Sequence, residues 1–177
     1  LYESESQQMM ANKLGLLEFR PRDKELLDGL ENVLSLAETD MTLFYRGLAD
    51  ATEEMTPTAR FNCLHDAFYT ESELTDPVTD EISRWLGDYL QRVSTDDVSD
   101  QQRRDRMNQV NPLYVLRNYR AQLAIDAAGE GNFSAVNELL DVLRNPYTEQ
   151  PHRDEYAAKR PEWARHRVGC SMLSCSS

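Results

Sequence analysis

MNQVNPLYVLRNYRAQLAIDAA, the stretch at residues 107–128, contains a helical pattern that breaks in its middle and then resumes. Asn111 is a favourable N-cap residue, and Pro112 suits a first helical turn, where its missing N–H group costs no hydrogen bond. Proline also disfavours the α conformation in the residue before it. The stretch therefore predicts a corner between two helices at Asn111-Pro112, with the second helix starting at once.

The residues after this corner predict a pair of antiparallel helices. The first helix ends at Gly129 and Gly131, and the second starts at Phe133-Ser134 and ends before Pro146. Two helices joined by a short glycine-containing loop form an αα-hairpin. The helical spacing predicts these inward positions: Leu116, Tyr119, Leu123 and Ala127 in the first helix, and Val136, Leu139, Leu140 and Leu143 in the second.

The chain before residue 107 has the same helical period, and no segment alternates as a half-buried strand does. We expect helices at residues 3–14 and 22–37, a third capped by Thr39 or Asp40, a fourth after Thr56-Pro57, a fifth opened by Thr75-Asp76-Pro77, and a short one capped by Ser99 and Gln102. The predicted fold class is all-α: an irregular bundle of about seven or eight helices that ends in the αα-hairpin and an extended C-terminal tail.

The sequence changes character after Pro146. Two prolines, Pro151 and Pro161, interrupt a segment that has room for one or two helical turns, and Tyr156 and Trp163 can hold it against the helices. We therefore divide the chain into a helical domain at residues 1–146 and an extended, weakly structured tail at residues 147–177.

The composition is that of a globular protein: of 177 residues, 40% are hydrophobic and 28% are charged. The formal net charge of −12 argues against nucleic-acid binding and against docking on anionic membranes. No apolar run approaches the roughly 20 residues that a membrane span needs. The N-terminal LYES has no basic region, apolar stretch or initiator Met, so we expect the cut edge of a longer protein rather than a signal peptide.

The sequence lacks the common catalytic and phosphate-binding motifs, among them GxxxxGK[ST], GxGxxG, GxSxG and HExxH. An odd number of widely spaced cysteines without a CxxC pair favours a reducing compartment. We expect no metal site, because neither the cysteines nor the histidines have ligand spacing: Cys63, Cys170 and Cys175; His65, His152 and His166.

Charged residues elsewhere favour an ordinary surface. The adjacent acidic pairs Asp80-Glu81 and Asp96-Asp97 do not share a helix face, so we expect them to be exposed to solvent. Residues 153–167 are locally basic on an acidic chain. This segment either docks on an acidic neighbour or is simply solvated.

Two sets of residues are candidates for function. Arg117, Asn118 and Arg120 either lie on the outer edge of their helix with packed stems or hydrogen-bond a partner surface, and we take Arg117 and Asn118 as domain-facing contacts. Cys175, near the C-terminus, is either a free tail thiol or a thiol that exchanges with another sulfur.

Several segments closely resemble the C-terminal end of the selenoprotein O family, whose bacterial members are called YdiU. They are VNPLYVLRNYRAQLAIDAA, GNFSAVNELLDVLRNPY, RPEWARH and the terminal SCSS, with MMANKLGL and DMTLFYRGL fitting the preceding helices of the family. The resemblance covers most of the chain and is loose at residues 56–95.

The resemblance implies a protein with a kinase-like fold, a pseudokinase, that binds ATP in a flipped orientation with a divalent metal such as magnesium. Such proteins transfer AMP to Ser, Thr or Tyr hydroxyls of other proteins, in the bacterial cytoplasm or in mitochondria. The family's glycine-rich loop, phosphate-binding Lys and metal-binding Asp and Asn match nothing in this chain, so we expect it to bind no cofactor alone.

The resemblance also gives the terminal cysteine a role. Many eukaryotic members carry selenocysteine two residues before the C-terminal residue, a position held here by Cys175. This implies a redox-active residue in its plain-sulfur form. The stretch HRVGCSMLSCSS is longer than the usual end of the family, which makes Cys170 an extra thiol able to pair with Cys175.

We therefore predict that the chain is the C-terminal helical region of a selenoprotein O-like protein adenylyltransferase, inactive in isolation. Its expected partners are the N-terminal kinase-like core of the same protein and the protein substrates, with no nucleic acid and no membrane. The alternative is a free-standing helical module that binds a protein through residues 111–144 without catalysis.

Overall fold

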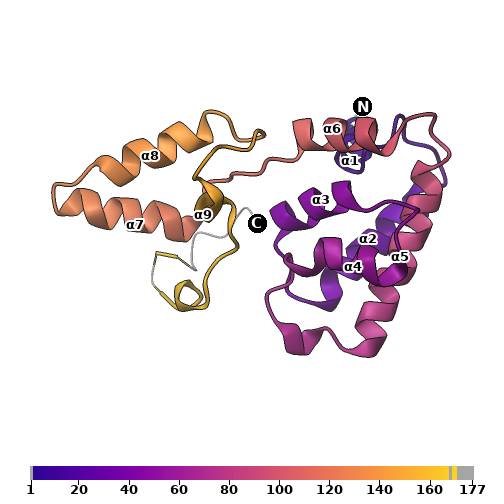
Figure 1. Cartoon of the computed structure of the whole chain (residues 1–177), viewed down its shortest axis with the longest axis horizontal. Coiled ribbons are helices and arrows are strands. Elements are labelled where there is room, and N and C mark those ends of the chain that lie inside the picture. The colour runs from indigo at the N-terminus through magenta and orange to yellow at the C-terminus, as the bar shows by residue number, and fades with distance from the viewer. Residues whose placement is uncertain (1, 168, 171–177) are drawn as a thin grey trace. The chain divides into compact units, whose positions relative to one another are not determined.

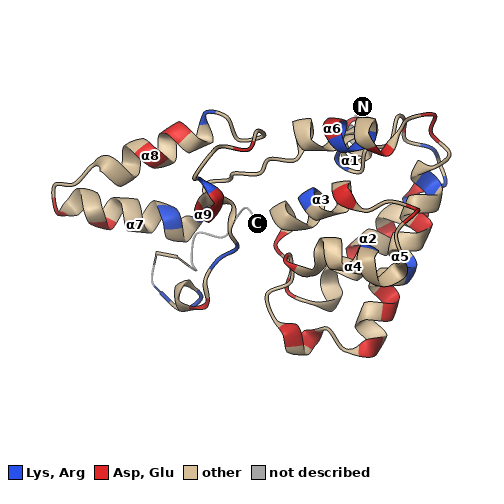
Figure 2. Cartoon of the chain, in the orientation of Figure 1, with Lys and Arg blue, Asp and Glu red and all other residues tan. Residues whose placement is uncertain are grey.

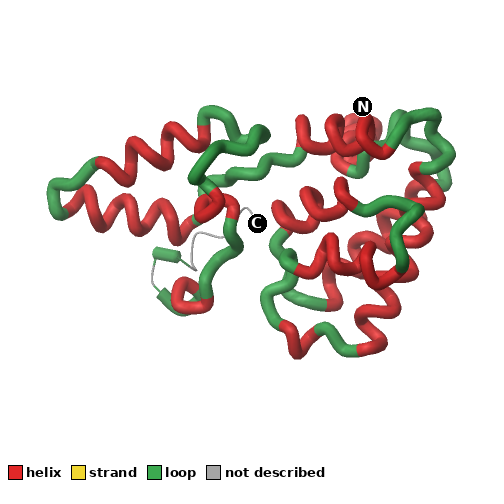
Figure 3. Tube along the Cα trace, in the orientation of Figure 1, coloured by secondary structure: helices red, strands yellow, loops and turns green. Residues whose placement is uncertain are grey.

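The computed structural model describes residues 2–167 and 169–170, and this part of the chain is all-α (Figure 1). It contains nine α-helices and two short 3-10 helices, and within these residues there is no strand beyond one isolated bridge between Thr39 and Phe68 (Figure 3). The predicted all-α class is confirmed. Within the same residues, no helix combines the length and the apolar character needed to cross a membrane.

The chain divides into two compact units, Leu1–Asn111 and Pro112–Ser177. The sequence analysis placed its boundary at residue 146 instead. The structure places the hairpin with the segment that follows Pro146 because the two pack on each other. Acidic residues are spread over helices of both units, and most of these helices carry basic residues as well (Figure 2).

The first unit is built from six α-helices whose ends follow local sequence signals. The Asp40 side chain accepts a hydrogen bond from the Leu43 N–H, Thr56 caps the helix that Pro57 opens, and Ser99 forms the predicted capping box. The elements are α1 (Tyr2–Lys13), α2 (Asp23–Leu36), α3 (Met41–Asp50), α4 (Pro57–His65), the 3-10 helix η1 (Glu71–Glu73), α5 (Asp76–Val93) and α6 (Asp100–Val110).

Helix α5 is the centre of this unit, and it packs against α2 and α4. The Trp85 ring stacks on the Tyr89 ring at a centroid distance of 5.5 Å, and its Nε1–H donates to the Leu26 carbonyl of α2 at 3.0 Å. A Cβ added to Gly29 of α2 would lie 2.9 Å from the Trp85 ring, so this close approach needs glycine. The other large residues of α5 in the core are Ile82, Leu86 and Leu90.

A buried arginine joins three helices of the unit. Arg103 of α6 is 2% exposed. Its guanidinium donates to the Leu48 carbonyl in the last turn of α3 at 3.4 Å and to the carbonyl of Ala51, the residue after α3, at 2.5 Å. It also donates to the Tyr89 hydroxyl at 3.1 Å, which itself donates to the Leu14 carbonyl at 2.9 Å. Burial raises the pKa of Tyr89 to about 12 despite the nearby positive charge, so the hydroxyl keeps the proton that it donates.

A second buried network ties the loop before α2 to the end of α5. Asp96 is 5% exposed, and its carboxylate accepts hydrogen bonds from Arg92 at 2.9 Å, from Arg20 at 2.8 Å and from the Leu17 N–H at 2.8 Å. Arg92 also donates twice to the buried Asp23 carboxylate, at 2.6 and 3.1 Å. The expectation that the acidic pair at this position is exposed is therefore wrong for Asp96.

The second unit contains the predicted αα-hairpin. Helices α7 (Asn118–Gly129) and α8 (Ser134–Leu143) run antiparallel, and the loop between them uses Gly131 at a φ of 86° (Figure 1). The short helices α9 (Asp154–Ala157) and η2 (Glu162–Ala164) follow in the segment after Pro146.

The break at Asn111-Pro112 differs from the prediction, since no helix restarts there. Residues 112–117 form no helix, and α7 begins only at Asn118. The N–H groups of Leu113 and Tyr114 both donate to the Pro146 carbonyl, at 2.7 and 3.0 Å, and the Tyr114 ring is buried against α7 and α8. These hydrogen bonds satisfy the N–H groups of Leu113 and Tyr114 while the chain stays extended. They outweigh the helix-starting signal of Asn111-Pro112.

Candidate functional site

The hairpin and the segment after it form the candidate site, since they carry the residues that the sequence analysis singled out. Arg117 immediately precedes α7, and its Nη2 donates to the Ala157 carbonyl of α9 at 3.4 Å. Asn118 is the first residue of α7 and is half-buried. The Arg117 contact lies inside the second unit, and the domain-facing role of both residues stays a prediction.

Arg120, which the sequence analysis grouped with these two residues but did not take as a domain-facing contact, holds the tail through several contacts. Its guanidinium donates to the Glu155 carbonyl at 2.5 Å and to the Glu155 carboxylate at 3.1 Å, and it lies 4.8 Å from the centre of the Tyr156 ring. Burial alone would lower the pKa of Arg120, but hydrogen bonds and nearby negative groups outweigh it, so the pKa is raised.

Other contacts continue this attachment along α8. The Tyr156 hydroxyl donates to the Glu138 carboxylate at 3.0 Å. The Gln150 side chain donates to the carbonyls of Val142 and Asn145 at 2.8 and 3.0 Å, which satisfies two acceptors near the end of α8. Residues 150–156 are thus held on the hairpin by specific contacts.

The last described residues pack beside the start of α7. Tyr119, Ala164 and Cys170 form a small buried cluster, and the Trp163 ring meets the Tyr119 ring edge-on at 6.0 Å. Cys170 is a free thiol, 4% exposed, so it must be uncovered before it can exchange with another sulfur. Cys175, the predicted redox residue, lies outside the described residues.

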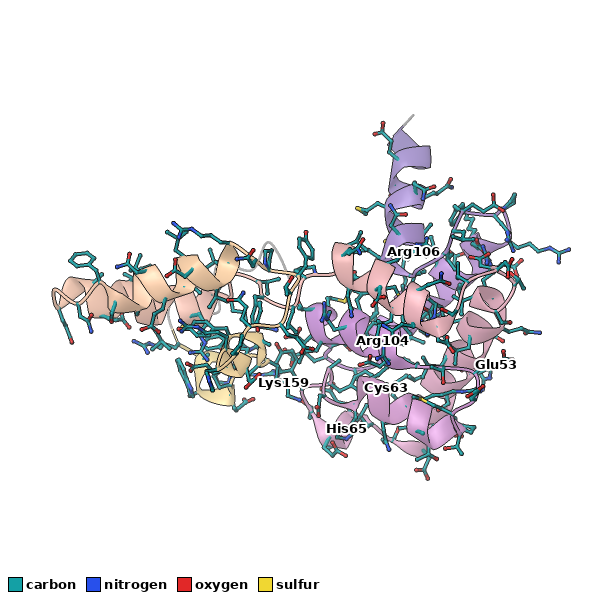
Figure 4. All side chains as sticks on the ribbon, turned by 45° about the horizontal axis from the view of Figure 1, so that its top comes forward. Glu53, Cys63, His65, Arg104, Arg106 and Lys159 are labelled. Atoms are coloured by element: carbon teal, nitrogen blue, oxygen red, sulfur yellow. The ribbon has the colours of Figure 1, made fainter. Side chains whose placement is uncertain are left out.

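Two further reactive side chains, Cys63 and His65, lie on α4 in the first unit (Figure 4). The Cys63 thiol donates to the Ala59 carbonyl at 3.4 Å, and burial, helped by the Asp50 charge, raises its pKa, so it is the unreactive protonated form. His65 lies 3.2 Å from the Glu71 carboxylate. Neither residue belongs to a metal-ligand cluster, because residues 2–167 and 169–170 contain no group of three such side chains.

Among the described residues, no three His, Cys, Asp or Glu side chains gather into a metal-binding group, and the sequence has no glycine-rich phosphate loop. What the arrangement can do is present a rigid helical surface, with its tail held in place by arginines.

Replacing Arg120 with alanine is expected to loosen the segment from α9 onward. The change removes both contacts to Glu155 and the stacking on Tyr156, while α7 itself keeps a good helix former. We expect amide hydrogen exchange at residues 150–167 to become at least about tenfold faster, since the lost contacts exceed about 1.4 kcal/mol. Arg144→Ala, at an exposed arginine that pairs only with Asp141, serves as the matched control and should leave those rates unchanged. Equal rates in Arg120→Ala and the wild type would contradict the assignment.

Comparison with known proteins gives a consistent result across the chain. The sequence model of the family Protein adenylyltransferase SelO matches residues 1–144. Proteins named "Protein nucleotidyltransferase YdiU" from Rhodopirellula baltica, Aromatoleum aromaticum and Flavobacterium johnsoniae are 53%, 48% and 46% identical, over 96%, 100% and 96% of this chain. In each case the match covers 33% of the relative, so the chain spans about a third of the length of these proteins.

Proposed function

The chain belongs to the SelO family of protein adenylyltransferases, and from this premise we propose that it is the C-terminal helical region of an enzyme that transfers AMP from ATP to Ser, Thr or Tyr hydroxyls of proteins. The observation that carries the proposal is identity of about half over nearly the whole chain to YdiU proteins three times as long. The kinase-like remainder of the protein supplies the ATP and magnesium site.

The role of this region in the proposed enzyme is to support that remainder. Its arginine networks fix the helices of the first unit, and its hairpin is an ordered element with an attached tail. The partners are the kinase-like core of the same polypeptide and the protein acceptors. The cytoplasm of a bacterium, or the mitochondrion of a eukaryote, is the expected location.

The activity is tested with the full-length protein. Purified protein is incubated with Mg²⁺, ATP and an acceptor protein, and the mass added to acceptor peptides is measured. The proposal expects the mass of AMP on Ser, Thr or Tyr, with release of pyrophosphate. Addition of a phosphate group instead, or no modification of any acceptor including the enzyme itself, contradicts it.

Cys175 is the proposed redox residue of this enzyme. Its thiol and a thiol of the kinase-like core would form a disulfide, giving two protons and two electrons to a disulfide oxidant such as oxidised glutathione. We expect AMP transfer by the full-length wild type to change severalfold between oxidised and reduced glutathione buffers, and Cys175→Ser to abolish that change. Cys63→Ser, at the protonated thiol of α4, is the control and should respond as the wild type does. A Cys175→Ser variant that also responds like the wild type would show that Cys175 is not a switch.

A further inference from the structure

Several apolar side chains in and next to the hairpin are exposed, although the helical period predicted four of them to be inward. Val136 and Leu140 of α8 are 40% and 50% exposed, and Ile125 of α7 and Phe133 before α8 are 60% and 61% exposed. Leu123 of α7 and Leu116 before it are 37% and 58% exposed. The inward positions predicted for Leu116, Leu123, Val136 and Leu140 are therefore wrong. The residues that do pack α8 into the unit are Leu139 and Val142.

Helical geometry places these exposed residues on one face. At about 100° per residue, Phe133, Val136 and Leu140 align along α8, and Ile125 aligns with two alanines along α7. On each helix, the exposed stripe is displaced around the helix axis in the same sense from the residues that are buried between the two helices. Because α7 and α8 are antiparallel, this displacement puts both stripes on the same side of the hairpin. We call this surface the apolar hairpin face; its members are Ala121, Ile125, Ala128, Phe133, Val136 and Leu140.

Among residues 147–167 and 169–170, the described contacts of the tail do not involve this face. These contacts reach side chains on the other side of the hairpin, where Arg167 pairs with Asp126 at 2.5 Å and the Tyr156 hydroxyl binds Glu138 at 3.0 Å. The hairpin is therefore polar and held on one side and apolar on the other. Apolar surface of this kind, in a chain of net charge −12, is typical of a contact with another part of a protein.

We propose that the apolar hairpin face docks on the part of the full-length protein that lies outside this chain. The proposal rests on the proposed function, since it takes the kinase-like remainder as the occupant. The length of the relatives supports this choice: about two thirds of a full-length family member is absent from these 177 residues and is available on the same polypeptide. None of the six residues of the face is charged, so the docking site on the remainder is an apolar patch.

A photo-crosslinking experiment on the full-length protein tests the docking directly. Leu140 is replaced with the photoreactive residue p-benzoylphenylalanine, and Asp141, the next residue on α8 but on a different side of it, is replaced in the control. After illumination, mass spectrometry should find crosslinks from position 140 to peptides outside these 177 residues and none from position 141. Crosslinks to a second copy of the protein, crosslinks only within the 177 residues, or no crosslink from position 140 would each overturn the proposal.

A charge substitution gives an independent readout. Leu140→Glu in the full-length protein should make the hairpin at least about tenfold more sensitive to limited proteolysis, because it sets a carboxylate against an apolar patch. Asn137→Glu adds the same charge at an exposed position of α8 and should leave the digestion rate unchanged. Equal rates in the two variants contradict docking through this face. Neither readout needs AMP transfer, so an inactive protein with the expected crosslinks would refute the proposed function and leave the docking intact.

Discussion

Arg103→Met is expected to lower the free energy of unfolding by about 3–5 kcal/mol. Methionine fills most of the volume of the arginine stem but cannot donate hydrogen bonds. The carbonyls of Leu48 and Ala51 and the Tyr89 hydroxyl would each lose a donor inside the first unit. The Leu48 carbonyl keeps the Ala51 N–H at 3.3 Å, so the main cost is at the Ala51 carbonyl and the Tyr89 hydroxyl, which lose a charged donor inside the core. Such losses cost about 1–3 kcal/mol each, which makes this the largest single-residue effect that we expect in the chain.

The measurement is chemical denaturation of wild-type and variant protein followed by circular dichroism. Arg104→Met is the matched control, because Arg104 is the neighbouring arginine on α6, is half-exposed and pairs only with the exposed Asp50. This control should change the free energy of unfolding by less than about 0.5 kcal/mol, as is usual for a surface pair. A loss below about 1 kcal/mol in Arg103→Met would mean that the buried guanidinium is replaceable by apolar packing.

Asp96→Asn is the second substitution with a large expected effect, a loss of about 3 kcal/mol. Asparagine has nearly the same shape but no charge, and it can accept with only one of the two atoms that now serve Arg92, Arg20 and the Leu17 N–H. The half-buried Arg92 would keep the Asp23 carboxylate as a charged partner but lose that of Asp96.

The control for this variant is Asp97→Asn, at the exposed neighbour, which should change the free energy of unfolding by less than about 0.5 kcal/mol. Both variants are compared at low and at high salt. Because Asp96 is buried, its effect should persist at high salt, whereas screening would remove the effect of a surface ion pair. A loss that disappears at high salt would show that the network is exposed in solution.

The features that were predicted correctly depend on residues close together in the sequence. The capping box at Ser99 and the Asp40 cap each need no more than four consecutive residues. The αα-hairpin likewise follows from a helical period and a short loop with Gly131. Such signals act in any tertiary context, which is why they could be read from the sequence.

The features that were missed depend on partners far away in the sequence. The burial of Asp96 depends on Arg20 and on the Leu17 N–H, which are 76 and 79 residues away. The delayed start of α7 depends on the Pro146 carbonyl, which takes the N–H groups of Leu113 and Tyr114. No local pattern reports such pairings.

The candidate site was predicted in part. The sequence pointed to the start of α7 and favoured Arg117 and Asn118, whereas Arg120 makes two hydrogen bonds to Glu155 of the tail. A signal for Arg120 was present in the aromatic residues Tyr119 and Tyr156, on which an arginine can stack, but their proximity is a property of the folded unit. The apolar hairpin face was missed, because the helical period predicted Val136 and Leu140 to be inward, and only the folded unit shows that they are exposed.

The most direct measurement compares this 177-residue chain with the full-length protein in one AMP-transfer assay. Each is incubated with labelled ATP, Mg²⁺ and the same acceptor protein, after circular dichroism has established that the isolated chain is helical. We predict label on the acceptor with the full-length protein and none above background with the isolated chain. Transfer of AMP by the isolated chain would contradict the account, because it would place the nucleotide site in the helices that we assign to support.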